Sequence, residues 1–302
     1  MPAVPVLRFA PPVLRFAPSP NGPLHLGHVL SALVGYRMAQ RAGGRYLLRI
    51  EDIDLTRSRE EHIAGIETDL AWLGIAFEQP VLRQSTRFPA YWEAARKLLG
   101  LGLLYPSFAT RSEINASEAD GATARDPDGA PLFPNRSKRP AAKDAERYLE
   151  DDNPRALRID MARAVGMARE RLEGAPLTFR EIAPDGVIKT HLAHPERWGD
   201  AVIVRKEVPA SYHLAVVVDD AAQGVTHVTR GQDLLAATGI HRLLQVLLEL
   251  PEPVYHHHAL ILSPNGRKLS KSAGASALAA LRQAGAAPQT VIAGLTINPP
   301  PI

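Results

Sequence analysis

The sequence predicts an α/β fold built around a parallel sheet. Short apolar segments alternate with longer helical patterns over residues 13–74, as they do when crossover helices join parallel strands. Apolar segments and a strongly periodic helix return over residues 201–262. A length of 302 residues, with 45% apolar and 22% charged side chains, suits one large domain or two modest ones.

The elements of the first half follow from apolar patterns and turn residues. Residues 13–16 predict a short strand, and the Pro- and Gly-rich residues 18–23 predict a loop. Residues 24–42 are typical of a helix, which ends at two glycines. Residues 46–50 predict a second strand that opens into an acidic loop, and residues 56–74 predict the next helix.

The middle of the chain interrupts this alternation. Residues 107–152 are rich in Ala, Asp, Pro and Arg and show little periodicity, which indicates a long and partly irregular insertion. The elements predicted after it are strands at 201–204, 214–218 and 225–228, a helix at 234–250 and a strand at 255–262. Only 30 residues follow Ser272, so we expect no further domain of ordinary size there.

Composition excludes several classes of protein. Cysteine is absent, which excludes disulfides, thiolate metal sites and cysteine nucleophiles. No apolar run reaches the roughly 18 residues of a membrane span, and the first residues lack a secretory signal pattern, so we expect a cytoplasmic protein without membrane association. The net charge of +3 permits a nucleic-acid partner without demonstrating one. VLRFAP occurs at 6–11 and again at 13–18, and we expect the second copy to supply the strand because it leads into the helix.

The first motif with chemical content is APSPNGPLHLGH at residues 17–28. A strand passes through this loop into a helix, whose first backbone N–H groups and positive dipole end favour phosphates. Gly27 would let a nucleotide lie against the backbone, and His25 and His28 could donate to phosphate oxygens. A histidine pair that merely caps the helix is one alternative, and a metal-binding pair is a second, although no third ligand is apparent in the sequence.

The second motif is GRKLSKS at residues 266–272. Two lysines three residues apart, among small hydroxyl side chains, suit the binding of a triphosphate, although a solvated surface loop would explain such a pattern alone. No Walker-type phosphate loop occurs elsewhere in the sequence.

Together these motifs resemble the paired signatures of class I aminoacyl-tRNA synthetases, and the resemblance is closest to their glutamyl subgroup. The segments that carry it are RFAPSPNGPLHLGH at 15–28, RIEDID at 49–54, YHLAVVVDD at 212–220, GVTHVTRGQD at 224–233 and KLSKS at 268–272. The resemblance covers essentially the whole chain from residue 13, and the region after Ser272 is too short for the anticodon-binding part of that subgroup.

The resemblance implies a Rossmann-like, parallel-sheet catalytic core with an inserted subdomain and no anticodon-binding domain. Residues 1–105 would form the first half of the core, 106–195 the inserted subdomain and 196–302 the second half. The truncated members of the subgroup activate L-glutamate with ATP and esterify the queuosine base in the anticodon of tRNA(Asp). The resemblance therefore implies these three partners, and we expect a monomer.

The resemblance also implies roles for individual residues. Glutamate has two carboxylates and one ammonium group, and arginine binds carboxylates through its planar guanidinium. The family pattern places Arg15 and Arg230 on the carboxylates, Glu51 on the ammonium group and Tyr212 beside them as a hydrogen-bonding neighbour. The residues that complete the implied glutamate site are Phe16, Ala17, Pro18 and Ser19.

Catalysis would consist mostly of positioning and of electrostatic stabilisation of phosphoryl oxygens. By the same resemblance, His25, Gly27 and His28 hold ATP, Lys271 meets its phosphates, and Lys268 belongs to the same catalytic set. ATP would be accompanied by Mg²⁺, and no side chain is required as a covalent nucleophile.

The sequence departs from the family at a zinc site that many members carry in the insertion. Ser107, Ala109, Phe133 and Ser137 stand where its ligands would fall, and none of them is a competent structural zinc ligand. We therefore expect no zinc.

In the triplet 256–258, strand alternation would turn His257 away from its two neighbours, which argues against a metal site. The basic residues at 136–143 are expected to form a solvated loop, with contact to RNA phosphates as the alternative.

Two other functions remain open from sequence. One is a conventional glutamyl-tRNA synthetase that charges the tRNA 3′ end without an anticodon domain. The other is a catalytically inactive paralogue that binds RNA or a partner protein, against which the intact His25, His28, Lys268 and Lys271 argue.

Overall fold

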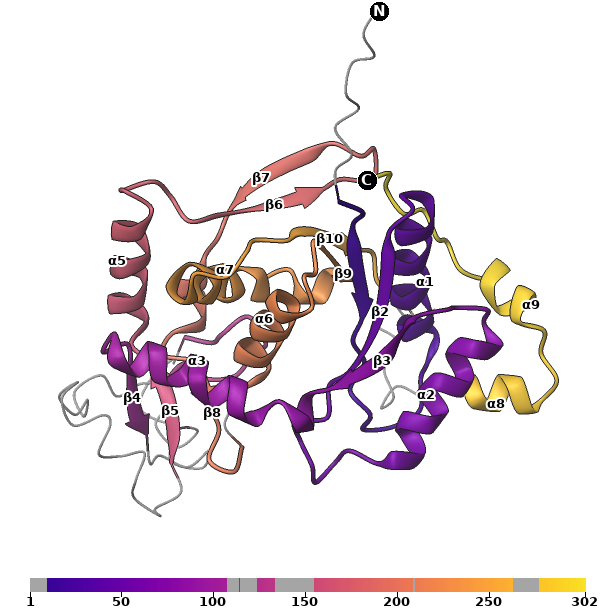
Figure 1. Ribbon diagram of the computed structural model, residues 1–302, viewed down its shortest axis with the longest axis horizontal. Coiled ribbons are helices and arrows are strands. Elements are labelled where there is room, and N and C mark those ends of the chain that lie inside the picture. The colour runs from indigo at the N-terminus through magenta and orange to yellow at the C-terminus, as the bar shows by residue number, and fades with distance from the viewer. Residues whose placement is uncertain (1–9, 108–113, 115–123, 134–154, 209, 263–276) are drawn as a thin grey trace, which may run out of the picture.

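The computed structural model describes residues 10–107, 114, 124–133, 155–208, 210–262 and 277–302 (Figure 1). The strands are β1 (Val13–Phe16), β2 (Arg45–Ile50), β3 (Glu78–Arg83), β4 (Leu104–Ser107), β5 (Ala156–Ile159), β6 (Thr178–Ile182), β7 (Ile188–Leu192), β8 (Val202–Val204), β9 (His227–Gly231) and β10 (Val254–His258). The helices are α1 (Leu26–Arg41), α2 (Glu60–Trp72), α3 (Phe88–Gly100), α5 (Met161–Arg171), α6 (Tyr212–Ala222), α7 (Ala237–Leu248), α8 (Leu278–Gln283) and α9 (Pro288–Ala293), with 3-10 turns η1 (Gln84–Thr86), η6 (Pro195–Trp198) and η7 (Gln232–Leu234).

Two sheets with parallel pairing form the centre of the molecule, as the alternating pattern predicts. In the first sheet β1, β2 and β3 are parallel and adjacent in that order. In the second sheet the order is β7-β6-β10-β9, with β6, β10 and β9 parallel and β7 antiparallel at the edge. The two sheets meet at β1 and β9, where the Thr226 backbone N–H donates to the Val13 carbonyl at 2.9 Å. The fold is therefore a mixed α/β architecture with parallel pairing, assembled from both ends of the chain.

A third, antiparallel sheet of β4, β5 and β8 lies beside α3, to one side of the parallel strands (Figure 1). Strands β6 and β7 fall within residues 106–195, the range expected to form the insertion, yet β6 pairs with β10 of the second half. The division of the chain at residues 105 and 195 stays a prediction.

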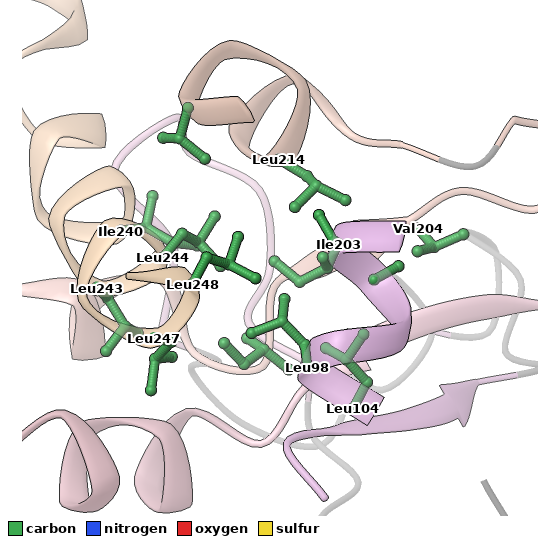
Figure 2. Close-up of a cluster of buried hydrophobic side chains, with 14 of the residues drawn as sticks. Leu98, Leu104, Ile203, Val204, Leu214, Ile240, Leu243, Leu244, Leu247 and Leu248 are labelled. Atoms are coloured by element: carbon green, nitrogen blue, oxygen red, sulfur yellow. The ribbon is translucent and has the colours of Figure 1, made fainter. Parts of the chain in front are cut away.

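The largest apolar core lies between α3, α6, α7 and the antiparallel sheet (Figure 2). Leu98 of α3, Ile203 of β8 and Leu214 of α6 are each 0% exposed there, and they meet a row of leucines from α7. A second core lies between α1, α2 and the first sheet. These cores fix the helices whose first turns reach the central cavity described below.

One predicted element is wrong. Residues 214–218 were expected to form a strand, but they lie inside helix α6. Five consecutive apolar residues carry no period that distinguishes a buried helix from a buried strand. Helix α6 is buried along most of its length, so its apolar residues do not alternate with polar ones in either period.

The end of the described chain returns to the first half of the core. Helix α8 lies beside α2, and Arg282 donates from Nε to Asp69 Oδ1 at 3.1 Å (Figure 1). The Leu278 backbone N–H donates to the Leu24 carbonyl at 2.8 Å, and the Leu278 side chain is fully buried. Within the described residues, no helix combines the length and apolar character needed to cross a membrane.

Candidate active site

A cavity of about 690 Å³ opens between the two parallel sheets. Its walls come from the loop after β1, the first turns of α1, the end of β2, the start of α6 and the ends of β9 and β10. Every described residue of the predicted site lines this one cavity: Arg15, Phe16, Ala17, Pro18, Ser19, His25, Gly27, His28, Glu51, Tyr212 and Arg230. Lys268 and Lys271 lie outside the described residues.

The two histidines of the first motif cap helix α1 as well as lining the cavity. His25 is the N-cap residue; its Nδ1 accepts from the Gly27 backbone N–H at 3.1 Å, while Nδ1 of His28 accepts from the His25 backbone N–H at 3.2 Å. Their rings are 3.9 Å apart between centroids. A Cβ at Gly27 would lie 2.9 Å from the His25 ring, so glycine leaves room for the cap itself. The two histidines therefore do cap the helix, as the alternative interpretation predicts, and they also line the cavity.

A buried group of charges supports the cavity lining at Arg15 and Glu51. Asp220 of α6 accepts from Arg15 Nε at 2.9 Å and from Arg49 Nη1 at 2.6 Å. Burial alone would raise the pKa of Asp220, but the two guanidinium groups outweigh it and lower that pKa to about 2. Asp220 is therefore a carboxylate at neutral pH, and it links β1, β2 and α6 at the site.

Glu51 follows β2 and receives one hydrogen bond from Arg49 Nη2, at 3.2 Å to Oε1. Burial raises the pKa of Glu51, because the carboxylate has lost water, and the nearby Arg49 and Arg15 offset only part of this effect. A cationic ligand beside Glu51 would favour its charged carboxylate and lower its pKa. Burial also raises the pKa of Tyr212, which therefore keeps its hydroxyl proton as a hydrogen-bond donor.

Arg230 differs from Arg15 in its neighbours. Its Nη2 donates to Thr238 Oγ1 at 2.7 Å, and its other nitrogens reach His257 and His241 at 3.2 and 3.1 Å. In the described part of the chain, no carboxylate lies within ion-pairing distance of this guanidinium, which is only 6% exposed. A buried cation with neutral partners is a good site for an anionic ligand.

Sequence reasoning missed the residues that support the arginines. Asp220 and Arg49 belong to segments that carried the resemblance, but only the fold shows that they join Arg15 to Glu51. The histidine triplet was interpreted as strand residues without a role. Alternation does separate them: His257 faces Arg230, while His258 lines the cavity, where its Nε2 meets Ser31 Oγ at 2.8 Å. The available signal was their position within a predicted strand.

The expected zinc position is only partly described. Ser107 Oγ accepts from Arg158 Nε at 3.3 Å, and the Arg158 guanidinium lies 4.2 Å from the centre of the Phe133 ring. Ala109, Ser137 and the basic residues at 136–143 lie outside the described residues. Among the residues that are described, no group of three or more His, Cys, Asp or Glu side chains is placed to hold a metal ion.

The described residues on either side of 263–276 lie at this cavity. Ile261 lines it, and Ala277 forms a β-bridge with His25.

Comparison with known proteins agrees with this arrangement. Residues 13–298 match the family model of tRNA synthetases class I (E and Q), catalytic domain. The chain is 44% identical to a glutamyl-Q tRNA(Asp) synthetase from Rhodobacter capsulatus, with 95% of this chain and 98% of that protein covered. It is 36% identical to a protein of the same name from Symbiobacterium thermophilum, with 94% and 87% covered.

Longer proteins also match. Glutamate–tRNA ligase 2 of a Ruegeria species is 35% identical, and the match covers 91% of this chain but 58% of that protein. A crystal structure of a glutamate tRNA ligase from Elizabethkingia meningosepticum, in complex with its amino acid, superposes with a TM-score of 0.66 at 27% identity. The chain spans about half of that ligase, 53% of its length. By its sequence match from residue 13 to residue 298 and by its fold, the chain belongs to the catalytic-domain family of class I tRNA synthetases of the E and Q group, and is a ligase of the aminoacyl-tRNA synthetase type.

Proposed function

We propose that this protein activates L-glutamate with ATP and transfers it to the queuosine base in the anticodon of tRNA(Asp). The observation that carries the proposal is the presence, within one cavity, of a buried acid, Glu51, and a buried cation, Arg230, that has no carboxylate partner among the described residues. The ammonium group and one carboxylate of an amino acid complement these two charges, and the second carboxylate of glutamate complements the further cation, Arg15. The near full-length match to proteins named glutamyl-Q tRNA(Asp) synthetase supports the choice of acceptor.

In this proposal Arg230 binds one carboxylate of glutamate and Glu51 binds its ammonium group. Arg15 binds the other carboxylate. A guanidinium has five N–H donors, and the bonds of Arg15 to Asp220 and to the Thr229 carbonyl engage three of them. The Tyr212 hydroxyl donates to the ligand between these groups, and residues 16–19 form the wall beside it.

ATP would lie at the start of α1, where the helix dipole and backbone N–H groups favour its phosphates. His25, Gly27 and His28 hold the nucleotide, and Lys268 and Lys271 approach the phosphates from the segment between Ile261 and Ala277. Mg²⁺ would accompany ATP as the counter-ion of its phosphates. A carboxylate oxygen of glutamate attacks the α-phosphorus and pyrophosphate leaves; a hydroxyl of the modified base then attacks the acyl carbon and AMP leaves.

The test has two steps. Glutamate-dependent exchange between ATP and pyrophosphate, with glutamine and aspartate as controls, measures activation. Transfer of labelled glutamate is then compared between an anticodon stem-loop with queuosine, the same stem-loop with guanosine, and whole tRNA(Asp) with and without its 3′-terminal adenosine.

We expect charging of both queuosine-containing RNAs, none of the guanosine stem-loop, and no effect of removing the terminal adenosine. Charging that requires the adenosine and ignores queuosine would show a conventional glutamyl-tRNA synthetase instead. Absence of exchange under all conditions would favour an inactive RNA- or partner-binding protein.

A further inference from the structure

Two chains of hydrogen bonds converge on Arg230 from opposite sides. Parallel pairing of β9 with β10 places His257 directly opposite Arg230 in register, so the two side chains share one face of the sheet. Helix α7 covers that face and brings Thr238 and His241 to the same guanidinium. The Tyr255 ring lies 5.2 Å from the Arg230 carbon CZ, adding an aromatic face to the surroundings.

The first chain begins at Glu181 on β6. Its Oε1 lies 2.7 Å from His257 Nδ1, and a carboxylate can only accept, so this nitrogen carries the proton. Nε2 of His257 then presents a lone pair, which accepts from Arg230 Nε at 3.2 Å. Arg230 can only donate, so Glu181 and Arg230 favour the same tautomer from the two ends of the ring, and the Thr238 hydroxyl lies 3.1 Å from the same Nε2.

The second chain runs through His241 to His213. Arg230 Nη1 can only donate, so His241 Nδ1, at 3.1 Å, accepts. The proton of His241 is then on Nε2, which lies 3.2 Å from His213 Nδ1 and donates to it. Burial lowers the pKa of His257 to about 4 and that of His241 well below its usual value, and Arg230 adds to both effects.

Both rings next to Arg230 are thus neutral acceptors. They fix the direction of the guanidinium without cancelling its charge. The contrast is Arg15, whose Nε and Nη2 are both engaged by the carboxylate of Asp220. A carboxylate in place of either ring would compete with the ligand for Arg230, and a protonated ring would lose its bond to Arg230.

We propose that Glu181 is a positioning residue for substrate binding: it accepts from His257 Nδ1–H, fixes the ring whose Nε2 accepts from Arg230, and so holds Arg230, still fully charged, for a carboxylate of the amino-acid substrate. This inference rests on the proposed function for the identity of the ligand. It extends the site to Glu181, which lies outside the lining of the cavity.

The tautomer is measured first, without any assay of activity. In protein labelled with ¹⁵N-histidine at neutral pH, ring NMR correlations assigned with a His257→Gln variant should show His257 as the neutral Nδ1–H form. Glu181→Gln retains an acceptor oxygen and should preserve the wild-type ring signals, whereas Glu181→Ala removes the acceptor of Nδ1–H and should shift the Nδ1 signal. A wild-type His257 that is charged, or protonated on Nε2, would overturn the proposal.

Kinetics provide the second measurement. Glu181→Ala should raise the KM for glutamate about tenfold in ATP–pyrophosphate exchange, with kcat and the KM for ATP changed less than about threefold, and Glu181→Gln should restore the KM. Two control variants separate a specific effect on the KM for glutamate from the general effect of removing a Glu–His contact. Glu196→Ala removes an exposed Glu–His pair of the same kind, 2.9 Å from His194, and His191→Ala removes the other histidine contact of Glu181, at 3.3 Å.

The outcomes are distinguishable. An unchanged glutamate KM in a folded Glu181→Ala variant, or an equal rise in the control variants, would refute the positioning role. If the wild-type protein does not activate glutamate at all, the proposed function fails, while the NMR measurement still decides whether Glu181 fixes the His257 ring.

Discussion

At the scale of single residues, the site contains two arginines in different electrostatic states. Arg15 shares Asp220 with Arg49, and its position is fixed by an ion pair. Arg230 is held by neutral groups and retains its charge for a ligand. Residue type and motif position did not distinguish the two, because the difference lies in side chains contributed by other elements.

Arg230→Ala should raise the glutamate KM by about 30- to 1,000-fold, since loss of a charge-assisted bond costs roughly 2–4 kcal/mol. Arg230→Lys should recover only part of this loss, because an ammonium group cannot reproduce the bonds of the guanidinium. Steady-state exchange kinetics check this, with the exposed Arg45→Ala as the matched control. A KM that stays within a factor of two in Arg230→Ala would remove the residue from the glutamate site.

Ionisation of Asp220 should make the free energy of unfolding depend on pH in the acid range. Its pKa is about 2 in the folded protein against a usual value of 3.8, so the carboxylate stabilises the fold fully above about pH 4 and loses this contribution as the pH falls toward 2. The contribution is roughly 2 kcal/mol. We expect the difference in free energy of unfolding between wild type and Asp220→Asn to narrow by about that amount between pH 5 and pH 2 in urea titrations. A constant difference would contradict the ion-pair assignment.

At the scale of elements, the sequence predicts what depends on local pattern. β1, β2 and α1 lie within about two residues of their expected bounds, and α7 falls inside its expected range. Residues 214–218 were assigned wrongly because burial on all sides removes the period that separates helix from strand. The histidine support of Arg230 was not predictable either, since it depends on the register of β9 against β10 and on how α7 lies over them.

The prediction that the protein binds no zinc concerns residues at the antiparallel sheet. Because Ser107 pairs with Arg158, and Phe133 packs against the same guanidinium, two of the four expected ligand positions have other contacts. Elemental analysis should find well below one zinc per chain, and chelation should leave the Tm unchanged, with excess Mg²⁺ added back as the control. One zinc per chain, together with a lower Tm after chelation, would show that the site is retained.

At the scale of the whole molecule, the cavity is formed by segments from both ends of the chain. Arg15 lies 205 positions from its partner Asp220 and 214 positions from the Thr229 carbonyl that it also contacts. One cavity of a single chain contains all the described residues of the proposed site.

We therefore expect a monomer in solution, with a radius of gyration of about 19 Å for a compact chain of this length. Small-angle scattering coupled to size exclusion, over a concentration series, checks both mass and radius. A mass of two chains that persists on dilution would contradict this expectation and would place a second copy near the site.

The contact between β1 and the start of β9, which lie far apart in the sequence, also determines when the site can exist during synthesis. Arg15 leaves the ribosome long before Asp220, and at about 5–20 residues per second the interval is roughly 10–40 s. For that time β1 lacks the neighbour that β9 provides, and two arginines that end up buried remain in water. A chain interrupted before α6 therefore cannot bind glutamate in the proposed way, and exposes an apolar strand edge that the complete chain covers.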